Sequence, residues 1–271
     1  MTHILVTNDD GVFSPGLLAL KCALEAVGRV SVIAPDRNRS AIARGITIHT
    51  PLHIEQVELE DGSLAYATDG TPVDCVRFAM LGLLDGIPDV VVSGINMGLN
   101  MGDDVTYSGT VAAALEGVLL GWPAIAVSQQ HMGDPDDQWD GRHYEFDAVC
   151  NFVPHLVPLI TQNRFPRNVL LNVNAPARPA HDPPRARVTR LGRRIYNDAL
   201  VLEGTDGPRR RYTIYGERPG YHAQAGTDFA ALEVGEISVS PLHFELTDEQ
   251  GMDALSGLLE DHGLGHAEDQ Q

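Results

Sequence analysis

Hydrophobic and polar positions along the first two-thirds of the chain switch repeatedly between a strand-like and a helix-like pattern. Short runs rich in Val, Ile and Leu, typical of buried strands, are separated by longer segments with apolar residues at helical spacing. The predicted strands are residues 3–8, 30–35, 88–95, 123–128 and 168–176, and the predicted helices are residues 15–28, 71–84, 109–121 and 144–160. Because such alternation builds right-handed βαβ crossovers, it predicts a Rossmann-like three-layer α/β/α fold with a mostly parallel sheet.

Two segments depart from this pattern. Residues 45–59 alternate apolar and polar positions, which predicts a half-exposed antiparallel strand or hairpin. Residues 177–227 are rich in Pro, Arg and Gly, with short strand-like pieces at 187–191 and 211–215. We interpret this stretch as a protruding C-terminal β-arm rather than a poorly ordered segment. Arms of this kind often pack on a neighbouring subunit, so we expect a homodimer or a homotetramer.

The predicted domain organisation follows from these segments. Residues 1–176 form the α/β core that carries the candidate chemistry, and residues 177–227 form the extended arm. Residues 228–262 hold a returning strand and a C-terminal helix, and residues 263–271 form a polar, disordered tail.

Charge and composition exclude several classes of function. The chain has 37 acidic and 19 basic residues and a formal net charge of -18, which disfavours binding to nucleic acid or to an anionic membrane. No apolar run approaches the roughly 20 residues of a membrane span, and no signal peptide is recognisable. We therefore expect a soluble, cytoplasmic protein. The 3 cysteines lack Cys-x-x-Cys spacing, and we expect buried, reduced thiols.

Basic residues cluster in the otherwise acidic chain at 185–194 and 209–211. We interpret both clusters as solvated faces or as partners for the surplus acidic residues. Contact with a phosphate-bearing ligand is the alternative.

Unusual polar segments follow three of the predicted parallel strands. They are TNDDG at residues 7–11, PDRNRS at residues 35–40 and SGINMGLNMGDDVTYSGT at residues 93–110. Since ligands of open parallel sheets bind outside the carboxyl ends of the strands, the sequence predicts that these segments converge on one site.

Two adjacent aspartates, Asp9 and Asp10, begin this constellation. Within a strand their side chains would point to opposite faces, but past the strand end Gly11 permits a turn that aims both carboxylates forward. Two carboxylates accompanied by hydroxyl and amide oxygens suit a hard divalent ion such as Mg²⁺ or Mn²⁺. The alternative interpretation is an Asp-Gly turn with a helix-capping aspartate.

The third segment combines repeated glycines with Asn96 and Asn100 and ends in Ser108, Gly109 and Thr110 at the start of an alanine-rich helix. Exposed N–H groups and the positive end of the helix dipole favour an anion at this position. The spacing matches neither the dinucleotide fingerprint nor the Walker motif. A flexible loop that ends in an ordinary helix cap is the alternative.

The motifs TNDDG, APDRNRS, DGTPVDCV, VSGINMGLNMGDDVTYSGTVAAALEG, LNVNAP and GTDFAALEVGEISVSPL together resemble the SurE family of stationary-phase survival 5′-nucleotidases. The resemblance implies one divalent metal ion per subunit. It further implies that phosphate lies against Ser108, Gly109 and Thr110. Ala41 stands where the family usually has glycine, and residues 129–144 are longer and more acidic than usual. The metal ligands implied by the resemblance are Asp9, Asp10, Ser40 and Asn96.

The resulting hypothesis is a metal-dependent phosphomonoesterase that hydrolyses nucleoside 5′-monophosphates, with 3′-nucleotides and polyphosphate as further candidate substrates. Asp9 or Asp10 would take the proton of the attacking water, and Asn96 with residues 108–110 would contact the phosphate. A covalent route through one aspartate is a less favoured variant. A nucleotide-sensing module without hydrolysis and a structural interaction protein are the alternatives of a different class. Base preference, the physiological metal and the leaving-group acid are left open by the sequence.

Overall fold

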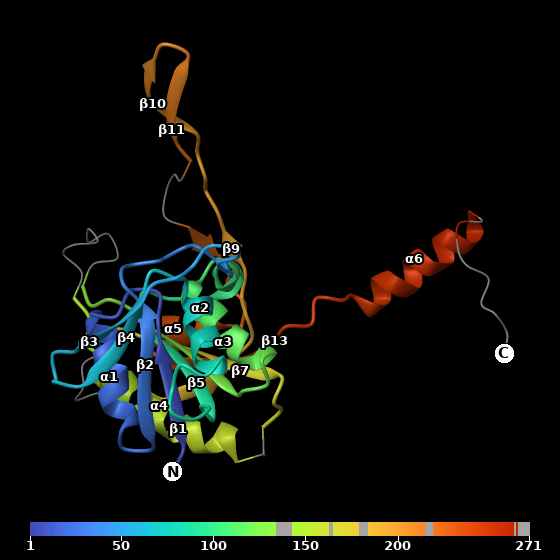
Figure 1. Cartoon of the computed structure of the whole chain (residues 1–271). Helices are drawn as coiled ribbons and strands as arrows, with labels where there is room; N and C mark the ends of the chain where they lie inside the picture. Colours follow the sequence, from blue (N-terminus) through green and yellow to red (C-terminus); the bar gives the residue numbers. More distant parts are fainter. Residues whose placement is uncertain (134–142, 163–164, 179–183, 215–218, 263, 265–271) are drawn as a thin grey trace.

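The computed structural model describes residues 1–133, 143–162, 165–178, 184–214, 219–262 and 264. Its centre is a 9-stranded sheet with the strand order β3-β4-β2-β1-β5-β6-β7-β13-β8 (Figure 1). The strands of this sheet are β1 His3–Thr7, β2 Arg29–Pro35, β3 Ile54–Glu58, β4 Leu64–Thr68, β5 Val90–Met97, β6 Ala124–Gln129, β7 Val169–Ala175, β8 Ala186–Val188 and β13 Ile237–His243. The helices are α1 Pro15–Leu24, α2 Pro72–Met80, α3 Gly109–Leu119, α4 Asp147–Thr161, α5 Asp228–Glu233 and α6 Glu249–Asp261, with a 3₁₀ turn at Gly102–Thr106.

The strands from β4 through β2, β1, β5 and β6 to β7 run parallel to their neighbours. β3 is antiparallel to β4 at one end of the sheet, and β13 is antiparallel to β7 near the other end. The predicted mostly parallel α/β fold is therefore confirmed. The carboxyl ends of β1, β2 and β5 lie at the same edge of the sheet, as the topology of parallel strands requires.

Alternating side chains of each central strand build two separate cores. On β1, Ile4 and Val6 pack into the core that contains residues of α1 and α4, whereas Leu5 packs into the core that contains residues of α2 and α3. All three side chains are fully buried. Because burying one such side chain contributes about 1.5–3 kcal/mol, strands that are apolar on both faces are stable only between two helical layers.

Residues 177–227 hold several short strands. β8 lies parallel to β13 and extends the central sheet, so the strand-like piece at 187–191 begins in the core sheet. β9 Arg194–Ile195 pairs with β12 Gly220–Tyr221. The hairpin of β10 Val201–Asp206 and β11 Arg209–Thr213 projects away from the body (Figure 1).

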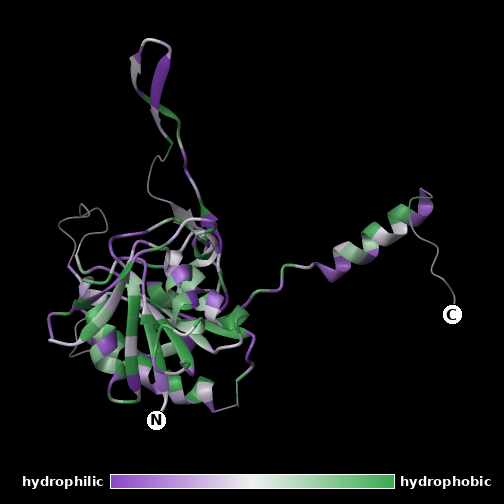
Figure 2. Cartoon of the chain, in the orientation of Figure 1, coloured by the Kyte–Doolittle hydropathy of each residue, from purple (hydrophilic) through white to green (hydrophobic). Residues whose placement is uncertain are grey.

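The C-terminal helix α6 also stands away from the body and has no buried residue (Figure 1). Figure 2 shows hydrophobic residues along this helix, and Met252, Leu255 and Leu258 are each 56% exposed. Except for Leu264, the tail predicted at residues 263–271 lies outside the described residues, as do residues 134–142 of the acidic stretch.

The structure departs from the sequence predictions in the segment after residue 45 and at two of the cysteines. Only residues 54–58 of the segment 45–59 form a strand, and its hairpin partner Leu64–Thr68 was not predicted. Cys75 is buried as expected, but Cys22 is exposed and Cys150 is half-buried. The expectation for Cys22 was wrong because the residue lies on the outer side of α1, next to charged groups rather than apolar ones. Among the described residues, no helix is long and apolar enough to cross a membrane.

Candidate metal and phosphate site

Asp9 and Asp10 lie in the turn that follows β1. The side chain of Asn8 closes this turn, donating from Nδ2 to the backbone oxygen of Gly11 (3.0 Å) and accepting from the Gly11 N–H (3.2 Å). Gly11 has a φ of +107°, and a Cβ there would lie 3.1 Å from the backbone carbon of Arg37. Only glycine fits both the conformation and the space, so the turn geometry explains why glycine follows the two aspartates.

Asp9 lies buried against the start of α3, with only 3% of its surface exposed. The Thr110 hydroxyl donates a hydrogen bond to Oδ1 of Asp9. A Cβ at Gly109 would lie 2.8 Å from both Cβ and Oδ2 of Asp9, so glycine is needed for this close approach. Burial raises the pKa of Asp9, while hydrogen bonds from Thr110 and the Gly109 amide act in the opposite direction.

Asp10 is held by two hydrogen bonds, one from the last residue of β5 and one from the loop after β2. Its Oδ2 accepts from the backbone N–H of Met97 at 3.0 Å, and its Oδ1 accepts from Nδ2 of Asn38 at 3.3 Å. Burial and repulsion by the neighbouring Asp9 raise the pKa of Asp10 to about 6. Part of the Asp10 population therefore carries a proton just below neutral pH.

Ser40 and Asn96, the other predicted metal ligands, lie on the two segments that contact Asp10, the loop after β2 and the end of β5. Oδ1 of Asn38 accepts from the backbone N–H of Ser40 at 2.8 Å, so Asn38 links Asp10 to the exposed Ser40. Asn96 lies near the end of β5, and its Nδ2 donates to the backbone oxygen of Gly98 at 2.9 Å. No described residue donates a hydrogen bond to Oδ1 of Asn96. Asn38 lies in the polar segment PDRNRS at residues 35–40, but nothing in the sequence indicated its contacts with Asp10 and Ser40.

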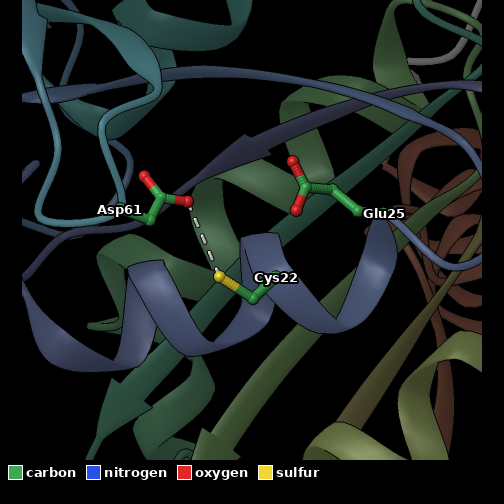
Figure 3. Close-up of side chains that lie close together, drawn as sticks. All are labelled: Cys22, Glu25 and Asp61. Carbon is green, nitrogen blue, oxygen red and sulfur yellow. Dashed lines mark hydrogen bonds between the residues drawn. The ribbon is translucent and has the colours of Figure 1, made fainter.

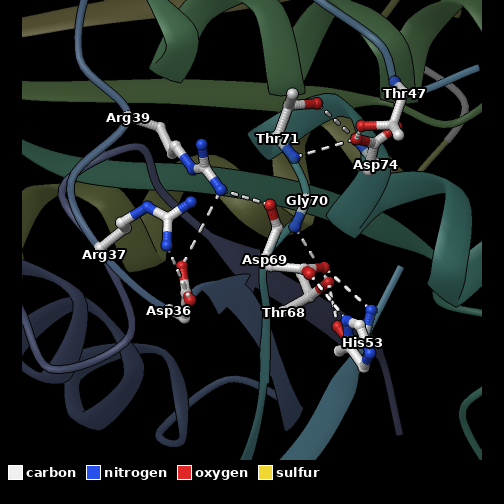
Figure 4. Close-up of polar contacts among 10 residues, drawn as sticks. All are labelled: Asp36, Arg37, Arg39, Thr47, His53, Thr68, Asp69, Gly70, Thr71 and Asp74. Carbon is white, nitrogen blue, oxygen red and sulfur yellow. Dashed lines mark hydrogen bonds and ion pairs between the residues drawn. The ribbon is translucent and has the colours of Figure 1, made fainter. Parts of the chain in front are cut away.

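The loop that carries Ser40 is tied to the body by polar contacts (Figure 4). The backbone N–H of Arg39 donates to the backbone oxygen of Asp9 at 2.7 Å, and its guanidinium donates to the backbone oxygen of Asp69. Farther along, Thr47 donates from its N–H and its hydroxyl to the Asp74 carboxylate, at 3.1 and 2.7 Å. Both ends of the loop are therefore fixed.

Arg44 adds a charged anchor to the same loop. Glu116 is fully buried in α3, and Arg44 and Arg77 each approach one of its carboxylate oxygens to 2.6 Å. The Ser40 loop, α2 and α3 are joined through this one carboxylate. Between the anchors Ala41 has a φ of 59° and Ala43 a φ of 53°, both in the left-handed region that favours glycine.

The donor set at this edge fits a hard divalent cation. All predicted ligand atoms are oxygens, from two carboxylates, a hydroxyl and an amide. Among the described residues, no Lys or Arg side chain forms an ion pair with Asp9 or Asp10. The raised pKa values of these two aspartates show how poorly their negative charges are offset by the protein itself.

A second acidic cluster provides a contrast. Cys22, Glu25 and Asp61 lie close together on the outside of the molecule (Figure 3). The Lys21 ammonium group forms ion pairs with both carboxylates of this cluster, at 2.8 Å to Glu25. Because Lys21 already offsets one of the two negative charges and is paired with both carboxylates, we assign no metal to this cluster.

The predicted phosphate contacts lie directly beside Asp9. Ser108 caps α3, and its Oγ accepts from the Val111 N–H at 3.1 Å. The hydroxyl groups of Ser108 and Thr110 thus already have partners within the protein. Their contact with phosphate stays a prediction, and the sequence had not indicated that Thr110 orients Asp9.

The chain matches known proteins over most of its length. The family model described as "Survival protein SurE" matches residues 4–198. The "5′-nucleotidase SurE" of Rubrobacter xylanophilus is 50% identical over 255 residues, covering 93% of this chain and 96% of the relative. That of Herpetosiphon aurantiacus is 44% identical, covering 94% of this chain and 97% of the relative.

Among solved structures, the SurE protein from Aquifex aeolicus superimposes with a TM-score of 0.78 at 37% sequence identity. The match covers 94% of this chain and 99% of the Aquifex chain. Sequence and architecture therefore agree over nearly the full length. The chain belongs to the SurE family.

Proposed function

We propose that this protein is a metal-dependent 5′-nucleotidase, a phosphomonoesterase that hydrolyses nucleoside 5′-monophosphates to nucleoside and phosphate. The observation that carries the proposal is the pair Asp9 and Asp10, two adjacent carboxylates just past the end of β1 that form no ion pair with a Lys or Arg side chain among the described residues. The relatives named 5′-nucleotidase SurE support the choice of substrate. A cytoplasmic location is part of the proposal.

Asp9, Asp10, Ser40 and Asn96 would hold one Mg²⁺ or Mn²⁺ ion. When bound, such an ion polarises a phosphoryl oxygen and lowers the pKa of a water molecule. The protein's contribution is to fix the oxygen donors: Thr110 orients Asp9, and Asn38 with the Met97 N–H orients Asp10.

The residues also define how a proton is taken and how phosphate is placed. Asp9 or Asp10 would accept the proton of the attacking water, because a positioned carboxylate can act as a general base. Asn96 and the first turn of α3 at Ser108, Gly109 and Thr110 are the proposed phosphate contacts, because helix N-termini favour anions. Glycine at position 109 keeps that turn close to Asp9.

The test is phosphate release from AMP with Mn²⁺ or Mg²⁺, with and without EDTA. We expect Asp9→Asn to abolish release while circular dichroism shows a folded chain, and Asp61→Asn, outside the site, to retain it. Binding of AMP without phosphate release by the wild-type protein would overturn the proposal in favour of a nucleotide-sensing module. Assays of 3′-AMP and polyphosphate decide whether the substrate range extends to them.

Self-association through the arm is part of the same proposal. The β10–β11 hairpin exposes Leu202 and Tyr212 beside the basic residues 209–211, in a chain with a net charge of -18. Both features favour a second, acidic copy of this chain as the partner. Light scattering of the wild type and of a variant lacking residues 200–214 tests this. An unchanged molar mass per particle, after allowing for the deleted residues, would contradict it.

A further inference from the structure

A cavity of about 500 Å³ lies outside the carboxyl ends of β5 and β6, next to the candidate metal site. The metal and phosphate contacts proposed above do not use it. It lies between the loop after β5, the end of β6, the β9–β12 pair and α5. Main residues of its wall are Leu99, Gln130, Arg194, Tyr221, Phe229 and Glu233.

One wall of the cavity is an aromatic stack. The rings of Tyr221 and Phe229 lie 4.8 Å apart between centroids and only 4° from parallel. Phe229 is buried, whereas Tyr221 is half-buried and lines the cavity. Flat aromatic surfaces of this kind bind other flat rings by stacking.

The charge of the cavity disfavours an anion. Arg194 is the one cationic side chain among the described lining residues. Its Nε pairs with Oδ2 of Asp104 at 2.6 Å, and its guanidinium lies 4.7 Å from the ring centroid of Phe229. Since the Arg194 charge is already paired with the Asp104 carboxylate, the cavity suits a neutral ring better than a phosphate group.

Two polar groups at the wall are available to a ligand. Gln130 accepts from the Ala177 N–H through Oε1 at 3.0 Å, and its Nε2 donates to no described residue. The exposed Glu233 forms no hydrogen bond or ion pair with any described residue. An amide donor and a carboxylate acceptor match the mixed acceptor and donor edge of a nucleobase, which an apolar ring would not use.

The cavity also lies within reach of the phosphate site. Leu99, which lines it, comes three residues after Asn96, so their Cα atoms are at most about 11 Å apart. That separation is on the scale of one nucleotide. A ligand with its phosphate at Asn96 could therefore place its base beside Leu99.

We propose that this cavity is the base subsite of the enzyme, in which the nucleobase of the substrate stacks on Tyr221 and contacts Gln130 and Glu233. The inference rests on the proposed function, because it assigns the other half of the same substrate. It identifies the base, and not only the phosphate ester, as a group that the protein recognises.

The experiment compares AMP with ribose 5-phosphate, which carries the same phosphate ester but no base. The full chain is assayed with Mn²⁺ as wild type, Tyr221→Leu and Tyr221→Phe. We expect Tyr221→Leu to lower the ratio of kcat/KM for AMP to that for ribose 5-phosphate roughly 10-fold, within the range for base–aromatic stacking. Tyr221→Phe keeps the ring and should retain most of the ratio.

A second measurement separates failure of the subsite from failure of the proposed function. Adenosine, which has no phosphate, is titrated calorimetrically into metal-free wild type and Tyr221→Leu. Binding of adenosine to the wild type that weakens in Tyr221→Leu supports the subsite even if AMP is not hydrolysed. An unchanged kinetic ratio in Tyr221→Leu, or adenosine binding that is equal in both proteins or absent from both, would overturn it.

Discussion

Replacing Asp10 by asparagine should make the metal-free protein more stable at alkaline pH while removing its function. The substitution removes the charge that Asp9 repels but keeps the size of the side chain. The new Oδ1 can still accept from the Met97 N–H, whereas the contact with Asn38 Nδ2 is lost because two amide NH₂ groups would face each other. The balance of these two effects sets the expected change.

The charge term follows from the pKa of Asp10, which burial and, second to it, repulsion by Asp9 raise from 3.8 to about 6 on folding. A carboxyl group with a raised pKa leaves stability unaffected below pH 3.8, lowers it progressively up to pH 6, and lowers it by a constant amount above. Two pKa units correspond to about 3 kcal/mol, and the lost hydrogen bond costs about 1 kcal/mol. We expect the variant to gain about 1–2 kcal/mol at pH 8 and to lose up to about 1 kcal/mol at pH 4, where mainly the lost hydrogen bond counts.

The assay is urea unfolding of both proteins in EDTA at pH 8 and pH 4. Asp61→Asn serves as the control of opposite sign. The hydrogen bond from Lys21 lowers the pKa of Asp61, so this variant should lose stability at pH 8. Adding Mn²⁺ should then stabilise the wild type, by about 2.7 kcal/mol at one hundred times the dissociation constant, and should have little effect on Asp10→Asn.

Equal stability of metal-free wild type and Asp10→Asn at pH 8 would contradict this prediction. The prediction also fails if the difference between the two proteins is the same at pH 4 and pH 8. Either result would mean that the protein itself already compensates the charge of Asp10.

Three further predictions concern the support of the site. Thr110→Val should lower kcat/KM for AMP about 10-fold or more and should move the acidic limb of the pH profile of kcat/KM to higher pH, because Asp9 loses a charge-assisted hydrogen bond. Thr110→Ser should retain most activity, and an unshifted pH profile in Thr110→Val would contradict this role. Ala41→Gly should raise the free energy of unfolding by up to about 1 kcal/mol by relieving the left-handed φ of 59°, and a measured loss in urea unfolding would contradict it. Arg44→Leu should lower the free energy of unfolding by about 1–3 kcal/mol, because the buried Glu116 carboxylate then pairs only with Arg77. The same variant should bind Mn²⁺ more weakly, because Arg44 anchors the loop that carries Ser40; unchanged Mn²⁺ affinity by calorimetry would exclude that coupling.

The fold was predictable where side-chain periodicity is strong. β1, β5, β6 and β7 are apolar on both faces, and that pattern has one stable solution, a parallel sheet between helices. β4 was missed because it is short, contains two alanines and forms only when β3 and β2 lie on either side of it. The environment of Cys22 depends on which side of α1 faces the sheet, and the spacing of apolar residues along this helix did not decide it.

The candidate site divides in the same way. Asp9 and Asp10 stand out in the sequence because two like charges follow a buried strand. The contact between Asp9 and Thr110 joins residues 101 positions apart, and the spacing of residues carries no signal for it. Asn38 was overlooked for a related reason, since an asparagine in a polar loop becomes informative only when its two partners are known.

Anomalous diffraction from a crystal soaked in Mn²⁺ is the sharpest test of the proposed metal site, because it locates the ion without relying on activity. We expect one strong peak within coordination distance of Asp9 and Asp10, with oxygens of Ser40 and Asn96 completing the set. Manganese bound at Glu25 and Asp61, with no peak at the end of β1, would contradict it.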